Sequence, residues 1–297
     1  MPLPFVVPQY QTGAQAADHP EGESRLRVLF VGAQPLDTAL PPLNLLSEWR
    51  QIVRAVERMS GPLALVRLVP PTIGELQAAL ANLRHPYAVA HVVGHGSGDR
   101  VYLEHEDGSS DFATVSELAD AFSRGRTQLV VLNLCRAWEL GQALRAAGIP
   151  AVIATDDEVG DRGAAAMAAG LYAGLAGGQP LQAAYEMGLA RVARVDPGLE
   201  GRYRLLAADP EQTLLLPEHT APDPRLFSGQ PPHNLLRNID TFVGREDELI
   251  AIYEWFTAES RTGVLALTGL GGIGKTALAL AAAERYGWLF PRGVIFL

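Results

Sequence analysis

A histidine and the only cysteine of the chain follow two apolar segments at equivalent places. His95 and Gly96 come just after the run 87–93, and Cys135 comes just after the run 128–134. If these runs are neighbouring parallel strands, their carboxyl ends meet at one edge of a sheet, where α/β proteins place active sites. A thiol and an imidazole at that edge are the groups a cysteine protease needs, with the histidine activating the thiol and later protonating the leaving amine. The backbone N–H groups of Gly96 and Cys135 are natural donors to the oxyanion.

Other interpretations of these residues stay open. A lone cysteine at a strand end is often a small buried hydrophobe. His91, on the same run as His95, is expected to face the core. Asp156, Asp157 and Glu158 follow a fifth apolar run. Asp156 and Asp157 could line a specificity pocket and select a basic side chain, or they could form a solvated turn.

A second chemical motif lies near the end of the chain. Residues 269–276 read GLGGIGKT and satisfy GxxxxGK[ST] between a predicted strand and a predicted helix. In such a loop, backbone N–H groups surround phosphate oxygens, Lys275 reaches the β and γ phosphates, and the Thr276 hydroxyl ligates Mg²⁺. Lys275 is the only lysine in the chain. The pattern predicts a site for ATP or ADP with Mg²⁺, with Thr276 as the metal ligand, formed by Gly269, Gly271, Gly272, Gly274, Lys275, Thr276 and Ala277.

The elements that must position the first site are short apolar runs that alternate with helical patterns. This alternation predicts parallel strands joined by right-handed crossovers, and hence a three-layer α/β domain over residues 26–215. Helical spacing of apolar residues begins at Leu45, and Thr72 with Glu75 forms a capping box. The predicted strands are 28–31, 63–69, 87–93, 128–134 and 149–154, and the predicted helices begin near 45, 72, 160 and 181.

Three further segments complete the organisation. Residues 1–25 are polar without periodicity and are expected to be a disordered tail. Residues 216–240 are rich in proline and are expected to be a semi-rigid linker. Residues 241–297 contain a helical pattern, the predicted strand 264–268, the glycine-rich loop, a helix from Lys275 and a predicted strand 294–297. Because only 22 residues follow Lys275, we expect an incomplete ATPase domain, either a fragment of a longer polypeptide or a vestigial loop.

Composition limits the classes of function. The 297 residues carry a formal charge of -9, so neither nucleic acid nor an anionic membrane surface is an expected partner. A single cysteine permits no intrachain disulfide, which fits a reducing compartment. The amino terminus lacks the pattern of a signal peptide, and the small apolar run 163–178 is too short to span a membrane. The composition favours a cytoplasmic protein.

The first domain resembles a known family at several of these segments. LFVGAQP, HVVGHG, VLNLC and IPAVIAT resemble the CHAT domain family of caspase-like proteases, over most of residues 26–215. The resemblance implies that His95 and Cys135 are the catalytic dyad, that Gly96 supports the oxyanion, and that the substrate is a protein or peptide cleaved without a cofactor. The chain departs from the family pattern on both sides of Cys135 and at Asp156, where a bulky residue is usual.

The last segment is similar to another family. FVGREDEL at 242–249 and GLGGIGKT resemble STAND or NB-ARC-type ATPases, which implies that Val243 and Arg245 border the adenine. The combined resemblance implies a caspase-like three-layer sandwich with a mostly parallel sheet, followed by the first β–P-loop–α unit of a truncated P-loop NTPase domain. It implies a nucleotide-regulated endopeptidase that forms homo-oligomers on activation and cleaves a partner protein in bacterial defence or cell death. Two alternatives remain: an inactive caspase-like adaptor, and a P-loop NTPase whose first domain binds a small ligand.

Overall fold

The computed structural model describes most of two segments of the chain. The described residues are 26–37, 40–59, 63–84, 86–97, 100–135, 137–213, 215, 242, 244–258, 263–290 and 294–296. The predicted tail 1–25 and the predicted linker 216–240 lie outside these ranges, so those two predictions are not addressed by the structure.

A six-stranded, mostly parallel sheet forms the centre of the first segment. Its strand order is β2-β1-β3-β7-β8-β9, and only β9 runs antiparallel to its neighbour. All five predicted strands are present, and β9 is an additional strand that the apolar pattern did not indicate. The strands are β1 (Leu26–Gly32), β2 (Leu63–Arg67), β3 (Val89–Val93), β7 (Leu129–Asn133), β8 (Ala151–Thr155) and β9 (Tyr203–Ala207).

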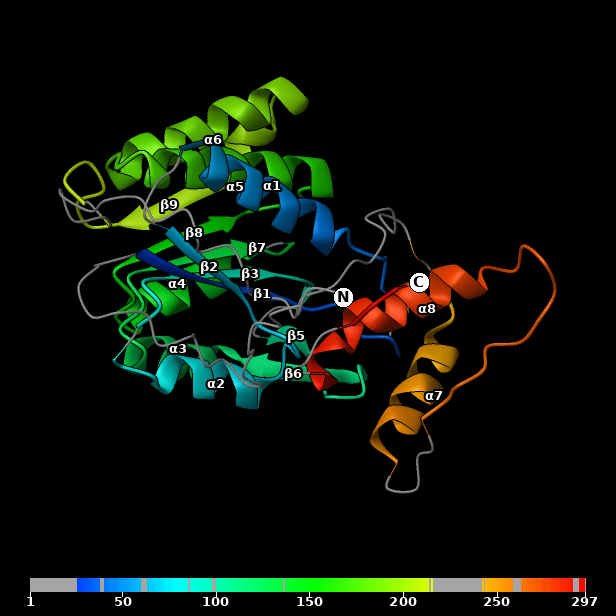
Figure 1. Cartoon of the computed structure of the whole chain (residues 1–297). Helices are drawn as coiled ribbons and strands as arrows, with labels where there is room; N and C mark the ends of the chain where they lie inside the picture. The colour runs from blue at the N-terminus through cyan, green and yellow to red at the C-terminus, as the bar shows by residue number, and fades with distance from the viewer. Residues whose placement is uncertain are drawn as a thin grey trace, which may run out of the picture.

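Helices cover both faces of this sheet (Figure 1). The residues of β1, β3, β7 and β8 are therefore buried throughout, which explains their continuous apolar runs. Along β1, Phe30 packs into one core and Leu29 into the other. The predicted three-layer α/β domain is confirmed. One layer contains α1 (Leu45–Met59), α5 (Asp161–Ala176) and α6 (Leu181–Val195), and the other contains α2 (Ile73–Ala81), α3 (Val115–Arg124) and α4 (Trp138–Ala146).

A small antiparallel sheet follows β3 directly. It consists of β4 (Gly96–Ser97), β5 (Arg100–Glu104) and β6 (Ser110–Thr114), in that order. Thr114 then begins α3 through a capping box with Glu117. Because β4 starts one residue after His95, this small sheet determines where the chain goes as it leaves the edge of the main sheet.

The second segment contains two helices and a short 3₁₀ turn. α7 (Glu246–Thr257) packs on α8 (Lys275–Arg285) through Leu249, Ile252, Leu278, Ala282 and Tyr286. The turn η2 (Gly287–Leu289) follows α8, while a similar turn, η1 (Leu199–Arg202), precedes β9. Both helices agree with the predictions, and they lie beside β5 and β6 (Figure 1).

The predicted strand 264–268 is wrong as a description of this structure. The segment forms no strand, and Val264 is 84% exposed. A strand needs a neighbour for its backbone N–H and C=O groups, and no described residue pairs with this segment. Of the predicted strand 294–297, only an isolated bridge at Val294 is present among the described residues. The loop and the helix of the predicted β–P-loop–α unit are therefore formed, and its strand is not.

No helix in the described part of the chain is long and apolar enough to cross a membrane.

Candidate functional site

The register of β3 and β7 brings the histidine and cysteine segments together. The two strands are parallel, with Val93 opposite Asn133, so His95 and Cys135 each lie two residues beyond a matched pair. A Cβ atom placed on Gly96 would lie 3.6 Å from the carbonyl oxygen of Cys135. The two segments are therefore in van der Waals contact at the carboxyl edge of the sheet, as the sequence predicted.

His95 is fixed by a backbone carbonyl from a third segment. Its Nε2 atom lies 2.9 Å from the oxygen of Pro41, in the segment between β1 and α1, and its ring meets Tyr102 edge-on at 6.5 Å. A carbonyl oxygen can only accept, so Nε2 must carry the proton of this bond. In the neutral ring, Nδ1 is then the unprotonated nitrogen that can accept a proton from a thiol. Sequence reasoning did not find Pro41, because a backbone acceptor has no residue-type signature.

Cys135 is exposed, which argues against the interpretation of this residue as a buried core thiol. The residue before it is held from β8, where the Thr155 hydroxyl donates to the Leu134 carbonyl at 2.6 Å. α4 begins at Trp138, three residues further along. The cysteine thus sits on a short connection whose beginning and end are both fixed.

The backbone at Gly96 has an N–H group directed away from the small sheet. Tyr102 N donates to His95 O at 3.0 Å, so His95 and Tyr102 form a hydrogen-bonded pair of the β4–β5 ladder. Such pairs alternate with non-bonded ones, and the next pair is Gly96 with Val101. The Gly96 N–H therefore points away from β5 and is not used by the β4–β5 ladder.

A buried polar cluster lies beneath the site, on the face of the sheet covered by α1 and α5. His91 is completely buried, as predicted, but its nitrogens are not packed against carbon alone. Nε2 lies 2.7 Å from Glu48 Oε1, and Nδ1 lies 3.0 Å from the Tyr172 hydroxyl. Asn133 also donates to Glu48 Oε1. Burial, with a smaller effect of the Glu48 charge, raises the pKa of Tyr172 well above its ordinary value, so Tyr172 keeps its proton and can donate to Nδ1.

Sequence reasoning missed three members of this cluster. Glu48 lies three residues after Leu45 and four before Ile52, which places it on the apolar face of its helix. Asn133 is the last residue of the otherwise apolar strand β7. A polar residue at an apolar position of the pattern is the signal that could have found both. Tyr172, in an alanine-rich helix, gives no such signal.

Asp156 and Asp157 are each paired within the chain. Arg204 on β9 lies 2.6 Å from Asp156, and Arg202 lies 3.5 Å from Asp157. Arg202 also donates to the backbone oxygen of Glu158. A basic substrate side chain would have to replace these arginines to reach either carboxylate.

The glycine-rich loop leads directly into α8. Gly272 and Gly274 have φ values of 78° and 89°, in the left-handed region that favours glycine, and Lys275 is the first residue of the helix. The Lys275 ammonium donates to the carbonyls of Gly269 at 3.0 Å and Leu270 at 2.8 Å. The Lys275 side chain is therefore folded back onto the loop that would bind a phosphate.

The remaining predicted nucleotide residues surround this loop. Gly271 and Thr276 are exposed, and Ala277 is half-buried in the first turn of α8. Arg245 donates to the Ile273 carbonyl at 2.7 Å and so joins the start of α7 to the loop. Val243 lies outside the described residues. Within the described ranges, His, Cys, Asp and Glu form no cluster able to hold a metal ion.

The comparisons with known proteins concern the first domain. The family model of the CHAT domain matches residues 10–196. Among solved structures, the Arg-specific cysteine proteinase gingipain R is similar at 12% sequence identity and a TM-score of 0.45, over 63% of this chain. The match covers 47% of the gingipain chain, so this chain spans about half the length of that proteinase. No curated protein matches the chain. Because the family model spans well over half of the 297 residues, the chain belongs to the CHAT domain family, whose members are caspase-like proteases.

Proposed function

We propose that the CHAT domain is a cysteine endopeptidase with His95 and Cys135 as its catalytic dyad. The observation that carries the proposal is an exposed cysteine just after β7, next to the end of β3, where a histidine has its Nε2 proton held by the Pro41 carbonyl. That bond leaves Nδ1 as the base. The alternative of an inactive adaptor predicted an occluded Cys135 or no contact with His95, and the exposure of Cys135 argues against the first of these.

The reaction follows from these groups. His95 Nδ1 accepts the thiol proton, and the Cys135 sulfur attacks the peptide carbonyl carbon, whose oxygen becomes an anion. The Gly96 N–H is available to donate to that oxyanion. When the C–N bond breaks, the imidazolium gives its proton to the leaving amine, and a thioester remains on Cys135. His95 then takes a proton from water, which hydrolyses the thioester and restores the thiol.

The Pro41 carbonyl contributes in both halves of this cycle. It accepts from Nε2–H when the ring is neutral and remains an acceptor when the ring becomes an imidazolium. A hydrogen bond to a charged donor is stronger than one to a neutral donor, so this contact stabilises the protonated histidine. It also keeps the ring from rotating away from the thiol between the two proton transfers.

We assign selection of a basic substrate side chain to Asp156 and Asp157. In support, both carboxylates follow β8 at the same edge of the sheet as the dyad, and both already bind arginine side chains from this chain. Arg204 and Arg202 would give way to the substrate. Asp156→Asn should then reduce cleavage after basic residues more than cleavage after apolar residues, and an unchanged preference would remove Asp156 from the pocket.

Turnover of a fluorogenic peptide mixture tests the endopeptidase assignment. Cys135→Ala and His95→Ala should each lower the rate by about a thousandfold or more. His105→Ala, at an exposed histidine between β5 and β6, is the matched control and should retain the wild-type rate. Cleavage that survives Cys135→Ala would contradict the assignment.

We further propose that the loop 269–276 binds ATP or ADP with Mg²⁺ and that this module regulates the protease in a homo-oligomer. The motif and the start of α8 at Lys275 support the binding, since the loop residues and the helix N-terminus suit a phosphate. Bound Mg²⁺ would neutralise phosphate charge. Lys275 would exchange two carbonyls for phosphate oxygens, and the Thr276 hydroxyl would hold the ion. Cleavage of a partner protein in bacterial defence or cell death is the role that this architecture suggests.

Binding of a fluorescent ATP analogue tests the nucleotide assignment. Lys275→Ala should weaken binding by tenfold or more, because it removes the only lysine of the loop. Arg124→Ala, which changes an exposed arginine on α3, is the control for net charge. Equal affinity of Lys275→Ala and wild type would contradict a functional phosphate loop.

A further inference from the structure

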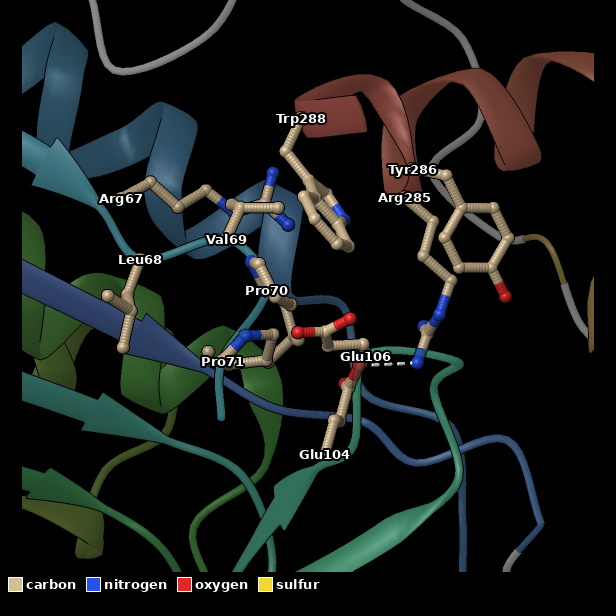
Figure 2. A pocket seen from close by; sticks show the side chains of 12 residues that line it. Arg67, Leu68, Val69, Pro70, Pro71, Glu104, Glu106, Arg285, Tyr286 and Trp288 are labelled. Atoms are coloured by element: carbon tan, nitrogen blue, oxygen red, sulfur yellow. Dashed lines mark hydrogen bonds and ion pairs between the residues drawn. The ribbon is translucent and has the colours of Figure 1, made fainter. Parts of the chain in front are cut away.

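The carboxyl end of α8 is bound to the CHAT domain through Arg285. Its Nη2 atom donates to Glu104 Oε2 at 2.6 Å and to the Gln34 carbonyl at 3.1 Å, and it lies 3.5 Å from the Gly108 carbonyl. Both side chains are largely buried, with 21% and 6% exposure for Arg285 and Glu104. Figure 2 shows this contact among the residues that line a pocket between the two segments.

Contacts around Arg285 hold the two segments side by side. The Tyr286 hydroxyl donates to the Asp107 carbonyl at 3.1 Å, and the Tyr253 hydroxyl donates to Glu106 at 3.1 Å. Arg67 on β2 lies 3.9 Å from Glu284. The intervening cavity is about 50 Å³ in volume and is lined from both segments, by residues that include Arg67, Pro70, Glu104, Glu106, Arg285 and Trp288.

The first partner of Arg285, Glu104, is connected to His95 through β5. Glu104 is the last residue of this strand, and Tyr102 lies two residues before it. Tyr102 N donates to His95 O at 3.0 Å, and its ring meets the His95 ring edge-on. The position of β5 therefore affects both the backbone and the ring of His95.

The second partner of Arg285, Gln34, is connected to His95 through the segment between β1 and α1. Gln34 N donates to Glu104 Oε1 at 2.6 Å, so the Gln34 backbone is held by Glu104 and Arg285 together. The Gln34 side chain accepts from Leu43 N at 3.1 Å. Leu43 lies two residues after Pro41, whose carbonyl binds His95 Nε2.

We propose that Arg285 is a positioning residue of the protease site, acting through Gln34 and Glu104 on the two segments that hold His95. The inference rests on the proposed dyad, and it places part of the protease's support outside the segment matched by the CHAT family model. Arg285 also lies on the helix that begins at Lys275, about 15 Å along its axis. A change at the glycine-rich loop that moves this helix moves Arg285 with it.

The test is the pH dependence of Cys135 alkylation by iodoacetamide in the whole chain, followed by mass spectrometry. His95 paired with the thiol should place the wild-type midpoint below the ordinary thiol value of about 8.5, and His95→Ala should raise it. Arg285→Met keeps the aliphatic stem and removes the donors. It should raise the midpoint by about one unit, which is about a tenfold loss of thiolate below the midpoint. Arg285→Lys should restore part of the shift.

Two further variants separate positioning from general damage. Arg124→Met removes an exposed arginine that pairs with Asp120 on α3, and it should leave the midpoint unchanged. Gln34→Met keeps the backbone contacts of Gln34 and removes only the acceptor for Leu43, so it should raise the midpoint as Arg285→Met does. If Arg285→Met does not fold, Gln34→Met and Arg285→Lys decide the matter.

The outcomes distinguish the two proposals. If His95→Ala raises the midpoint while Arg285→Met and Gln34→Met leave it at the wild-type value, the inference about Arg285 is overturned and the dyad stands. If His95→Ala itself has no effect, the dyad is overturned, and the inference falls with it. A shift in the Arg124→Met control as large as that in Arg285→Met would also overturn the inference.

Discussion

At the scale of single residues, the site depends on polar atoms whose partners come from distant parts of the chain. His95 is 54 residues from the Pro41 carbonyl that fixes its tautomer, and His91 is 43 residues from Glu48. In the buried cluster of His91, Glu48, Asn133 and Tyr172, the hydrogen bonds can be assigned so that each has one donor and one acceptor. Tyr172 donates to Nδ1, Nε2–H donates to Glu48, and Asn133 donates to the same carboxylate oxygen.

Glu48→Gln should destabilise the fold, because a neutral amide oxygen accepts the His91 and Asn133 hydrogen bonds more weakly than a carboxylate oxygen does. Hydrogen bonds to charged groups contribute about 1.5–3 kcal/mol and neutral ones about 0.5–1.5 kcal/mol, so a loss of about 1–3 kcal/mol is expected. Urea unfolding measures the effect, with Glu57→Gln, at an exposed position of the same helix, as the control. Equal unfolding free energies for the two variants would show that the cluster does not stabilise the fold.

At the scale of elements, the sequence predicted the strands whose burial produces a recognisable apolar pattern. The five parallel strands are mostly apolar runs, and the predicted helices of the first domain carry periodicity, a capping box or many alanines. The helices α3 and α4 and the strands β5 and β6 were not predicted. β9, by contrast, is only partly buried, and β4 has two residues, so neither produces a run. The segment 264–268 shows the opposite error. Its apolar pattern predicts a strand, but no described residue pairs with it.

In the candidate site, too, the residues that follow from local sequence pattern could be predicted, and those that depend on long-range contacts could not. His95, Gly96 and Cys135 could be placed together because strand order and register follow from the fold class. Pro41 and Arg285 could not, because their roles depend on how loops and helices cross after folding, and the polar signal of Glu48 did not identify His91 as its partner. Residue type alone does not encode such contacts.

The close packing of α5 on α6 gives a prediction at this scale. A Cβ atom on Gly170 would lie 2.4 Å from the Met187 carbonyl oxygen and 2.6 Å from the Gly188 Cα atom, so the helices would have to separate. Overpacking of this kind costs about 1–3 kcal/mol, so Gly170→Ala should lower the free energy of unfolding by that amount. Gly201→Ala, where a Cβ would meet nothing within 4 Å, is the control. If the Gly170→Ala and Gly201→Ala variants are equally stable, this account of the α5–α6 interface is wrong.

At the scale of the whole molecule, the buried Glu104–Arg285 pair joins the CHAT domain to the helices that follow it. Burial raises the pKa of Glu104 above its ordinary value, against the opposing effects of Arg285, the Gln34 N–H and Arg67. The folded chain therefore binds this proton more readily than the unfolded chain does. The resulting contribution to stability is present below the unfolded-state pKa and is lost as the pH rises through the folded-state pKa.

Glu104→Gln removes this titration, so the stability of the variant relative to wild type should increase as the pH rises from about 4.5 toward neutrality. Urea unfolding at several pH values measures the difference. Glu139→Gln, at an exposed position of α4, should show no such trend. A relative stability of Glu104→Gln that falls as the pH rises would mean that the ion pair outweighs the cost of burying the carboxylate.

The central claim is that His95 and Cys135 form a competent dyad at the edge of the main sheet. Covalent labelling with electrophilic peptide ketones bearing basic, acidic or apolar side chains tests it most directly, since labelling requires attack by the thiol and no turnover. Intact mass spectrometry should show one label on the wild-type chain and none on Cys135→Ala or His95→Ala. Labelling that His95→Ala leaves undiminished, or a Cys135 that reacts with small alkylating reagents only after unfolding, would contradict the claim.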